Sequence, residues 1–404
     1  MTSRLHKHRI LILGGGYAGL MAAARSARIG SAADITLVNA APQFVQRIRL
    51  HEALAGAQPR QLTLAPFLAK RGVHFVQGFV EALEPERERI LGRTSAGTPL
   101  ELGYDQLIIA LGSRTSAPSP DVAAHTLRLN DVTEVHMASS QIQHIARRGG
   151  RVLVIGGGLT GIETATELAE RFPTLRVSLI TSGRLGDGYA VDGAAHLQRR
   201  FAQLSIDVRE HTPIIGVEQG RAWSADGTAL PFDMCVWCGG FEAPQLLREA
   251  GLQVDRHGRI VVDAMLRAVD HPNLFAVGDA AQVSVNGRAI RMGCVSALPM
   301  GAHVGNNLYR LYRGEELKPF SMAFALRCIS LGRQDALVQW THPDDIPRAK
   351  IWAQRPAVLV KELICRMTLA VVAGELRFGL PLYHWPHASG GASETDLSTS
   401  STRA

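Results

Sequence analysis

The chain has 404 residues, of which 46% are hydrophobic and 20% charged, a balance typical of a soluble globular protein with about two or three domains. Its net charge of +7 suits anionic ligands, but no block of Lys or Arg indicates a nucleic-acid partner, and we expect none. The chain has only five cysteines, no secretory signal and no apolar stretch of the roughly 20 residues that a membrane span needs, so we expect a cytoplasmic protein.

The first predicted element is a buried strand at residues 10–13 that runs into the turn Gly14-x-Gly16-x-x-Gly19 and a helix of small residues. The first glycine permits the turn, the second lets a pyrophosphate approach the backbone, and the third lets the helix pack on the strand. Phosphates would then lie at the positive end of the helix. The turn therefore predicts a dinucleotide site.

A second strand at residues 35–38 ends at Asn39, 25 positions after Gly14. An acid that binds a ribose is usual near this point, and Asn can accept the same hydrogen bond without a charge. Residues 44–56 follow, with Arg47 and Arg49. They are interpreted either as a solvated helix or as a segment whose arginines contact cofactor phosphates.

Residues 73–79 predict a third strand, and the short pieces of residues 80–102 predict a β-meander. The next strand, residues 104–113, ends in the small residues around Ala110 and Gly112. Small residues at the carboxyl end of a strand leave room for a ligand at the edge of the sheet. Residues 116–120 are rich in Pro and Ser and predict a linker.

The opening motif then recurs. A strand at residues 151–155 leads into Gly156-x-Gly158-x-x-Gly161 and a helix over residues 162–171. The strand that follows, residues 177–180, ends at Thr181, again 25 positions after the first glycine of the motif. Two copies with matched offsets predict two dinucleotide sites on one chain.

The end of that strand bears on the choice of nicotinamide cofactor. The stretch from Thr181 to Arg184 contains no acid, whereas NAD sites usually carry one to bind the ribose 2′-hydroxyl. The hydroxyl groups and Arg184 favour NADPH modestly over NADH.

Three later segments complete the pattern. A strand at residues 232–237 ends in two glycines, and a strand at residues 273–277 ends in Gly278-Asp279, whose carboxylate can accept hydrogen bonds from a ribityl chain. A helix is predicted over residues 294–311. The apolar residues 358–372 predict a helix that packs in the core or a dimer, which we favour over a membrane surface, and residues 387–404 predict disorder.

Cys235 and Cys238 have the CxxC spacing of a redox pair. A redox CxxC lies at a helix N-terminus, where the helix dipole lowers the thiol pKa, but these cysteines lie on a predicted buried strand. Residues i and i+3 of a strand point to opposite faces about 10 Å apart, beyond the reach of a disulfide. We therefore interpret both as structural cysteines, and no histidine spacing predicts a metal site.

With these motifs, the chain resembles the two-dinucleotide-binding-domain flavoproteins of the pyridine nucleotide-disulfide oxidoreductase superfamily, and most of all their type II NADH dehydrogenase-like branch. The resemblance covers about residues 8–310. It implies an α/β fold with two Rossmann-like domains and a C-terminal α+β segment. The implied divisions are 1–118 and 265–318 for the FAD domain, 119–264 for the inserted NAD(P)H domain, 319–386 for an interface segment and 387–404 for the tail.

The resemblance also implies site residues. FAD would be held by Gly14, Gly16, Gly19, Asn39, Ala110 and Asp279, and NAD(P)H by Gly156, Gly158, Gly161, Thr181 and Gly240. Further cofactor-binding candidates are Tyr17, Ala18, Arg47, Val80, Gly112, Arg184, Gly278 and Ala297. Glu163 matches a family glutamate near the nicotinamide and is the catalytic candidate for proton handling; the alternative is a first-turn carboxylate that the helix dipole stabilises.

The expected reaction is hydride transfer from NAD(P)H to FAD, followed by electron delivery to a quinone-like or other small acceptor. The helix at residues 294–301 lacks the paired glutamines of quinone-reducing members, and no long hydrophobic C-terminal anchor is present. Two alternatives therefore stay open: a reductase for an electron-carrier protein such as ferredoxin, and a non-enzymatic nucleotide-sensing flavoprotein. A homodimer is compatible with the sequence, and peripheral membrane contact is not favoured.

Overall fold

The structure is a computed structural model that describes residues 7–285 and 287–388. Its largest sheet is built around β1 (His8–Leu13), the strand before the first Gly-rich turn. β1 pairs in parallel with β2 (Ala33–Asn39) on one side and with β8 (Gln106–Ile109) on the other. Residues 10–13 are all buried, as a continuous apolar strand inside a parallel sheet requires.

This sheet joins segments that are far apart in the chain, because β21 (His271–Ala276) pairs in parallel with β8. β5 extends to Glu84, beyond the predicted end of the third strand at residue 79, and continues into the predicted antiparallel meander. The strand order is β20-β21-β8-β1-β2-β5-β6-β7, with β5 (Val73–Glu84), β6 (Arg89–Thr94), β7 (Pro99–Gly103) and β20 (Arg267–Ala268) as the remaining members.

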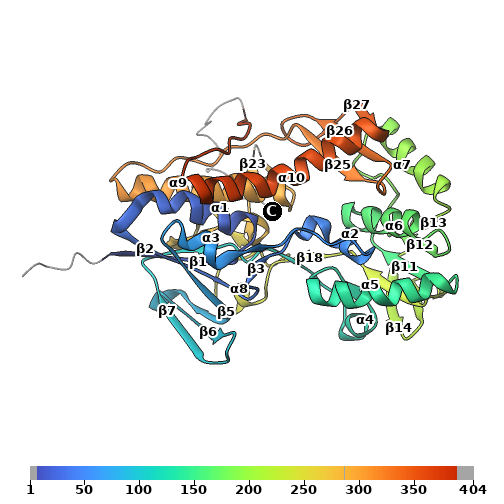
Figure 1. Cartoon of the computed structure of the whole chain (residues 1–404), viewed down its shortest axis with the longest axis horizontal. Coiled ribbons are helices and arrows are strands. Elements are labelled where there is room, and N and C mark those ends of the chain that lie inside the picture. Colours follow the sequence, from blue (N-terminus) through green and yellow to red (C-terminus); the bar gives the residue numbers. More distant parts are fainter. Residues whose placement is uncertain (1–6, 286, 389–404) are drawn as a thin grey trace, which may run out of the picture.

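The second Gly-rich turn belongs to a separate five-stranded parallel sheet at the opposite end of the long axis of the molecule (Figure 1). The order is β10-β17-β11-β12-β13, formed by β10 (Leu127–Arg128), β11 (Arg151–Ile155), β12 (Arg176–Ile180), β13 (Asp207–Arg209) and β17 (Met234–Trp237). The chain passes between the two sheets through β9 (Arg114–Thr115) and β18 (Phe241–Glu242), which pair with each other. The internal repeat of the sequence is thus a repeated strand-turn-helix unit in two sheets.

Helices cover these sheets, and the small residues of α1 let it pack along α9. The helices are α1 (Tyr17–Ser26), α2 (Leu50–Leu54), α3 (Leu64–Ala69), α4 (Pro120–His125), α5 (Val132–Arg147), α6 (Leu159–Arg171), α7 (Val191–Gln203), α8 (Leu246–Glu249), α9 (Cys294–Tyr312) and α10 (Gln354–Phe378). The smaller strands are β3 (Gln43–Phe44), β4 (Leu62–Thr63), β14 (Ile214–Glu218), β15 (Arg221–Ser224), β16 (Ala229–Pro231), β19 (Ile260–Val261), β22 (Ala281–Gln282), β23 (Ser284–Val285) and β24 (Arg288–Ala289).

The C-terminal segment forms a three-stranded antiparallel sheet and a long helix. The strands are β25 (Leu326–Ser330), β26 (Ala336–Thr341) and β27 (Pro347–Ala353), and α10 follows directly. In Figure 1, α10 (red) crosses one side of the molecule from this small sheet towards α1. A buried ion pair between Arg25 of α1 and Glu375 fixes its far end.

The apolar helix predicted at residues 358–372 therefore exists and is longer than expected. The predicted disordered tail lies outside the described residues, apart from its first two. Of these, Ala388 donates its backbone N–H to the hydroxyl of Ser321 at 3.2 Å.

Candidate active site

The first Gly-rich turn is tightly packed at its first and third glycines and has open space beside its middle glycine. A Cβ atom on Gly14 would lie 2.3 Å from the carbonyl oxygen of Ala110, and one on Gly19 would lie 1.9 Å from the carbonyl oxygen of Gly14. A Cβ on Gly16 would meet no heavy atom within 4 Å. The outer glycines are therefore required for packing, and the middle position faces open space at the start of α1.

The second turn repeats this arrangement. A Cβ on Gly161 would lie 1.8 Å from the carbonyl oxygen of Gly156, and one on Gly158 would meet nothing within 4 Å. In both folds, the residue at the end of the following strand packs on the turn. Asn39 Oδ1 accepts a hydrogen bond from the Gly15 N–H at 2.8 Å. A Cβ on Gly157 would lie 2.5 Å from Oγ1 of Thr181.

Polar groups gather at the carboxyl ends of β8 and β21. Ser113 Oγ donates to Asp279 Oδ2 at 2.8 Å, and the Gly293 N–H donates to Asp279 Oδ1 at 2.8 Å. Arg47 donates to the carbonyl oxygen of Ser113. Burial lowers the pKa of Arg47, and the charge of Asp279 partly opposes this. Segments from three distant parts of the chain thus place one guanidinium and one carboxylate at the same edge of the sheet.

The other candidates of the first fold lie around this edge. A Cβ on Gly278 would lie 3.2 Å from the Cβ of Ala18 and 3.5 Å from that of Ala297. The ring of Tyr17 packs edge-on against Phe44, with 4.9 Å between the ring centres. Strands β2 and β5 pair as far as Asn39 and Gln77, and Val80 lies three residues beyond this last pair. Gly112 and Gly240 both take positive φ angles.

One interpretation of residues 44–56 is wrong. They do not form a solvated helix: Leu50, His51, Ala53 and Leu54 of α2 are buried. Arg49 does not serve as a free phosphate ligand, because it pairs with Glu52 at 3.0 Å and with Glu362 of α10 at 2.9 Å. Helices α5 and α6 cover α2, and α10 adds the ion pair between Glu362 and Arg49, which a local charge pattern does not reveal.

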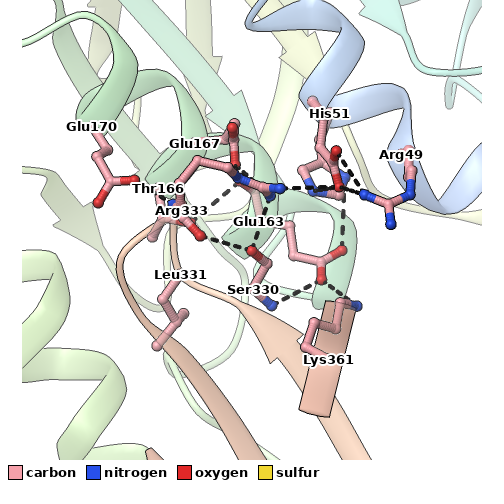
Figure 2. A network of polar contacts seen from close by, with 12 residues as sticks. Arg49, His51, Glu163, Thr166, Glu167, Glu170, Ser330, Leu331, Arg333 and Lys361 are labelled. Atoms are coloured by element: carbon pink, nitrogen blue, oxygen red, sulfur yellow. Dashed lines mark hydrogen bonds and ion pairs between the residues drawn. The ribbon is translucent and has the colours of Figure 1, made fainter. Parts of the chain in front are cut away.

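Glu163 lies at the centre of a buried polar cluster (Figure 2). Its Oε1 is 2.9 Å from Lys361 Nζ of α10 and accepts a hydrogen bond from the Ser330 N–H at 3.0 Å. Its Oε2 is 3.8 Å from His51 Nδ1. Glu163 lies beyond the first turn of α6, so its first-turn interpretation is wrong. Its partners are side chains and a backbone N–H of α2, β25 and α10.

The charges of this cluster follow from its geometry. Burial alone would raise the pKa of Glu163, but Lys361, His51 and the Ser330 N–H together lower it. Burial opposes the charge of Lys361, yet Glu163 raises the Lys361 pKa well above its usual value. Burial lowers the pKa of His51. Near neutral pH the cluster therefore holds a carboxylate, an ammonium and a neutral imidazole.

A second layer of charges connects this cluster to the surface. Arg333 pairs with Glu167 at 2.8 Å and with Glu52 at 3.3 Å, and the Arg333 N–H donates to Glu170 (Figure 2). Burial raises the pKa of Glu167 to about 7, although Arg333 lowers it. A cavity of about 30 Å³ lies between Glu52, Arg333 and Lys361. Glu167 can therefore exchange a proton near neutral pH, and its partner Arg333 lines a space that fits a water molecule.

Sequence reasoning did not find Lys361, Ser330 and Arg333. A signal for the first was present, because Lys361 stands in the apolar stretch of residues 358–372, where a buried charge requires a partner. No such signal identifies Ser330, which contributes only its backbone N–H.

Two features lie outside this cluster. A larger cavity of about 410 Å³ borders β9 and β18, but its lining mixes two arginines with three carboxylates and selects no ligand charge.

Cys235 and Cys238 are buried free thiols on opposite faces of β17 and its extension, because they belong to different core clusters. Burial raises the pKa of Cys238 to about 12. Their environment is that of structural cysteines.

Known proteins match both the sequence and the fold. A family model described as pyridine nucleotide-disulphide oxidoreductase matches residues 8–302. An NADH dehydrogenase-like protein of Mycobacterium tuberculosis is 27% identical over 353 residues, which covers 81% of this chain and 87% of the relative. Demethylphylloquinone reductase of Synechocystis is 25% identical over 349 residues, which covers 82% and 86%.

Among solved structures, NDH2 of Plasmodium falciparum in complex with NADH matches with a TM-score of 0.78 and 15% identity. The match covers 93% of this chain and 96% of that one. These comparisons confirm the resemblance and the α/β fold class inferred from the two Gly-rich turns and the Gly278-Asp279 strand end.

Proposed function

The chain belongs to the pyridine nucleotide-disulphide oxidoreductase family, and from this premise we propose that it is an NAD(P)H dehydrogenase that uses FAD and reduces a quinone-like acceptor. The relatives named as an NADH dehydrogenase-like protein and a demethylphylloquinone reductase support the donor and the acceptor class. The observation that carries the proposal within this chain is the buried Lys361–Glu163 pair, which keeps a proton on Lys361 under the covering helix α10.

The residues of the first fold fit FAD. The open side of Gly16 admits a pyrophosphate to the backbone at the N-terminus of α1, a place that a Cβ would fill. Asp279 and Arg47 offer an acceptor and a donor at the same edge. Asn39 replaces the usual acid, and its Oδ1 keeps one lone pair for a ribose hydroxyl beyond the bond from Gly15. Bound FAD would supply hydride acceptance and the release of electrons.

The second fold offers the corresponding place for the nicotinamide nucleotide, at the open side of Gly158 before α6. Gly156 and Gly161 close this turn, and Thr181 packs on it. Glu163 follows on the same helix. One rigid element, α6, therefore joins the turn that would bind the nucleotide to the buried ion pair.

The chemical role that we propose for the side chains of this chain is to supply protons to the acceptor. Reduction of a quinone takes up two protons with two electrons. Lys361 holds a proton at Nζ, and its loss would leave Glu163 as a buried, unpaired anion, so a replacement proton is strongly attracted. Glu167, whose pKa is about 7, can exchange a proton near neutral pH, and Arg333 joins it to the cavity that borders Lys361. We therefore assign Lys361 as the proton donor to the reduced acceptor and Glu163 as the group that keeps it charged.

We further propose that the acceptor is met at a lipid surface, through the outer face of α10. One face of this helix is buried, but Leu359, Leu363 and Met367 are 73%, 58% and 50% exposed, at a spacing that aligns them in one stripe. Arg355, Arg366 and Arg377 are exposed beside this stripe, at intervals of about three turns, and Arg366 also pairs with Glu362 at 2.7 Å. An apolar stripe beside a basic row fits an anionic membrane surface. Among the described residues, no helix has the length and apolar character to cross a bilayer.

The test is anaerobic reduction of the FAD-loaded protein by NAD(P)H, followed by mixing with menadione or with a ferredoxin. We expect bleaching of the flavin and fast reoxidation by menadione. Reoxidation by ferredoxin alone would favour a reductase for a carrier protein. A lasting charge-transfer band without turnover would favour a nucleotide sensor. A protein that binds no flavin would overturn the proposal.

A further inference from the structure

We propose that the two loops at the carboxyl ends of β12 and β13 form a site for the 2′-phosphate of NADPH, with Arg184 as its main ligand. The inference rests on the proposed function and makes it specific, because it names the donor nucleotide. It is argued from the backbone contacts between the loops, the positions of their acids and the exposure of Arg184.

The ribose end of the second fold is identified by Thr181. This residue packs on Gly157 as Asn39 packs on Gly15, so both stand where the strand after the Gly-rich turn ends. Thr181 is buried, and its Oγ1 accepts a hydrogen bond from the Gly183 N–H at 3.3 Å. A carboxylate at this position would hold the 2′-hydroxyl of NADH and repel a 2′-phosphate, and none is present.

Three backbone hydrogen bonds join the two loops into one platform. The Thr181 N–H donates to the carbonyl oxygen of Arg209 at 2.9 Å, and the Thr212 N–H donates back to Thr181 at 2.9 Å. The His211 N–H donates to the carbonyl oxygen of Gly183 at 3.0 Å. His211 is exposed, and this last hydrogen bond places the residue beside the end of β12.

The acids near this platform are bound to its backbone. Asp187 Oδ2 accepts the Arg184 N–H at 2.9 Å, and Glu210 Oε1 accepts the Leu185 N–H at 2.8 Å. Arg209 is paired with Asp207 at 3.3 Å. The Arg184 guanidinium is exposed and forms no ion pair with any residue that the structure describes. The platform thus presents an exposed guanidinium that forms no ion pair, with Ser182 and His211 as neighbouring exposed residues.

The C-terminal sheet holds this loop in place from its other side. Arg327 of β25 donates to the carbonyl oxygen of Gly188 at 2.9 Å, and Gln339 of β26 accepts the Ala190 N–H at 3.0 Å. A loop that is fixed before the ligand arrives loses less entropy on binding. A guanidinium held in this way can bind a phosphate through two parallel hydrogen bonds.

The test measures binding without turnover. The protein is first saturated with FAD, so that the first fold is occupied, and is then titrated by calorimetry with adenosine 2′,5′-bisphosphate and with adenosine 5′-monophosphate. We expect the bisphosphate to bind at least tenfold more tightly. Arg184→Ala should bring the ratio of the two affinities close to one, and Arg184→Lys should retain part of it. Arg176→Ala removes an exposed arginine from the opposite end of β12 and should keep the wild-type ratio.

Equal affinities in the wild type, an unchanged ratio in Arg184→Ala, or no binding of the bisphosphate would each overturn the inference. These outcomes are distinct from failure of the proposed function, because the titration involves no electron acceptor. A protein that binds the bisphosphate selectively but does not reduce menadione would retain the 2′-phosphate site and lose the quinone assignment.

Discussion

Lys361 Nζ lies 2.9 Å from Glu163 Oε1, and this contact joins the C-terminal helix α10 to the helix that follows the second Gly-rich turn. Both side chains are nearly excluded from solvent, with 17% and 10% exposed. The pair therefore has two consequences that can be separated by experiment: it attaches α10 to the nucleotide-binding body, and it holds a proton beside the proposed site.

The first prediction concerns stability. In the wild type, the lowered pKa of Glu163 adds stability above the ordinary Glu pKa of about 4.3, and the raised pKa of Lys361 adds stability below about 10.4. The contribution of the pair is therefore constant between about pH 5 and pH 10. Lys361→Met leaves a buried carboxylate without its cation and should cost about 3–5 kcal/mol of unfolding free energy near neutral pH.

The pH profile of Lys361→Met distinguishes this cause from a simple packing defect. Burial then raises the Glu163 pKa, so the stability of the variant should fall as the pH rises above about 4.3. Urea unfolding between pH 5 and pH 9 measures this slope. The double variant Glu163→Gln with Lys361→Met should recover most of the loss. A single variant whose profile runs parallel to that of the wild type would contradict the assignment of charges.

The second prediction concerns the two half-reactions. Lys361→Met removes the proposed proton donor and should slow reoxidation of the reduced flavin by menadione by about 10²-fold or more, with a much smaller effect on reduction by NAD(P)H. Stopped-flow absorbance of the flavin measures both steps. Lys361→Arg keeps the charge, but a guanidinium does not deprotonate in proteins as an ammonium can, so this variant should be slow in the same step. Equal slowing of both steps would indicate a structural defect.

The sequence predicted what local spacing encodes. The two Gly-rich turns, the matched offsets to Asn39 and Thr181 and the strand that ends at Asp279 are all fixed by neighbouring residues, and each is present. The ion pairs of Arg49 and Glu163 depend instead on where α10 packs, which no local period specifies. Residues 44–56 are likewise buried because α2 packs against α5 and α6, which come from a distant part of the chain, so a solvated helix fitted the local sequence equally well.

The third prediction contrasts two glycines of one turn. Gly19→Ala should destabilise the protein by about 1–3 kcal/mol, because the new Cβ would lie 1.9 Å from the Gly14 carbonyl oxygen. Gly16→Ala meets no neighbour within 4 Å and should fold with nearly normal stability, yet bind FAD at least about tenfold more weakly, because the methyl group occupies the approach of the phosphate. Thermal unfolding of the flavin-free protein and FAD titration separate the two effects. Normal FAD affinity in Gly16→Ala would place the phosphate elsewhere.

The fourth prediction concerns Glu167, whose pKa of about 7 exceeds the ordinary value of 4.5. A raised carboxyl pKa means that the folded state binds a proton more tightly than the unfolded state. The stability it contributes is therefore greatest below about pH 4.5 and falls as the pH rises to 7, by up to about 3 kcal/mol. Glu167→Gln should lack this slope. Unfolding free energies of both proteins at pH 5, 6, 7 and 8 provide the comparison, and parallel profiles would remove Glu167 from the proposed proton supply.

The last prediction concerns the apolar stripe of α10. Leu363→Glu with Met367→Glu should abolish binding to vesicles that contain anionic phospholipid, because burial of two such side chains is worth about 1.5–3 kcal/mol each and hence more than tenfold in affinity. Val191→Glu with Ile215→Glu is the matched control, since these side chains are 85% and 68% exposed and belong to α7 and β14 instead of α10. Flotation measures binding, and sedimentation velocity measures the oligomeric state. The contrary result is a wild type that does not bind vesicles but forms a dimer, with only the α10 variant dissociating that dimer. This result would make the stripe a subunit interface and would exclude the lipid surface as the place where the acceptor binds.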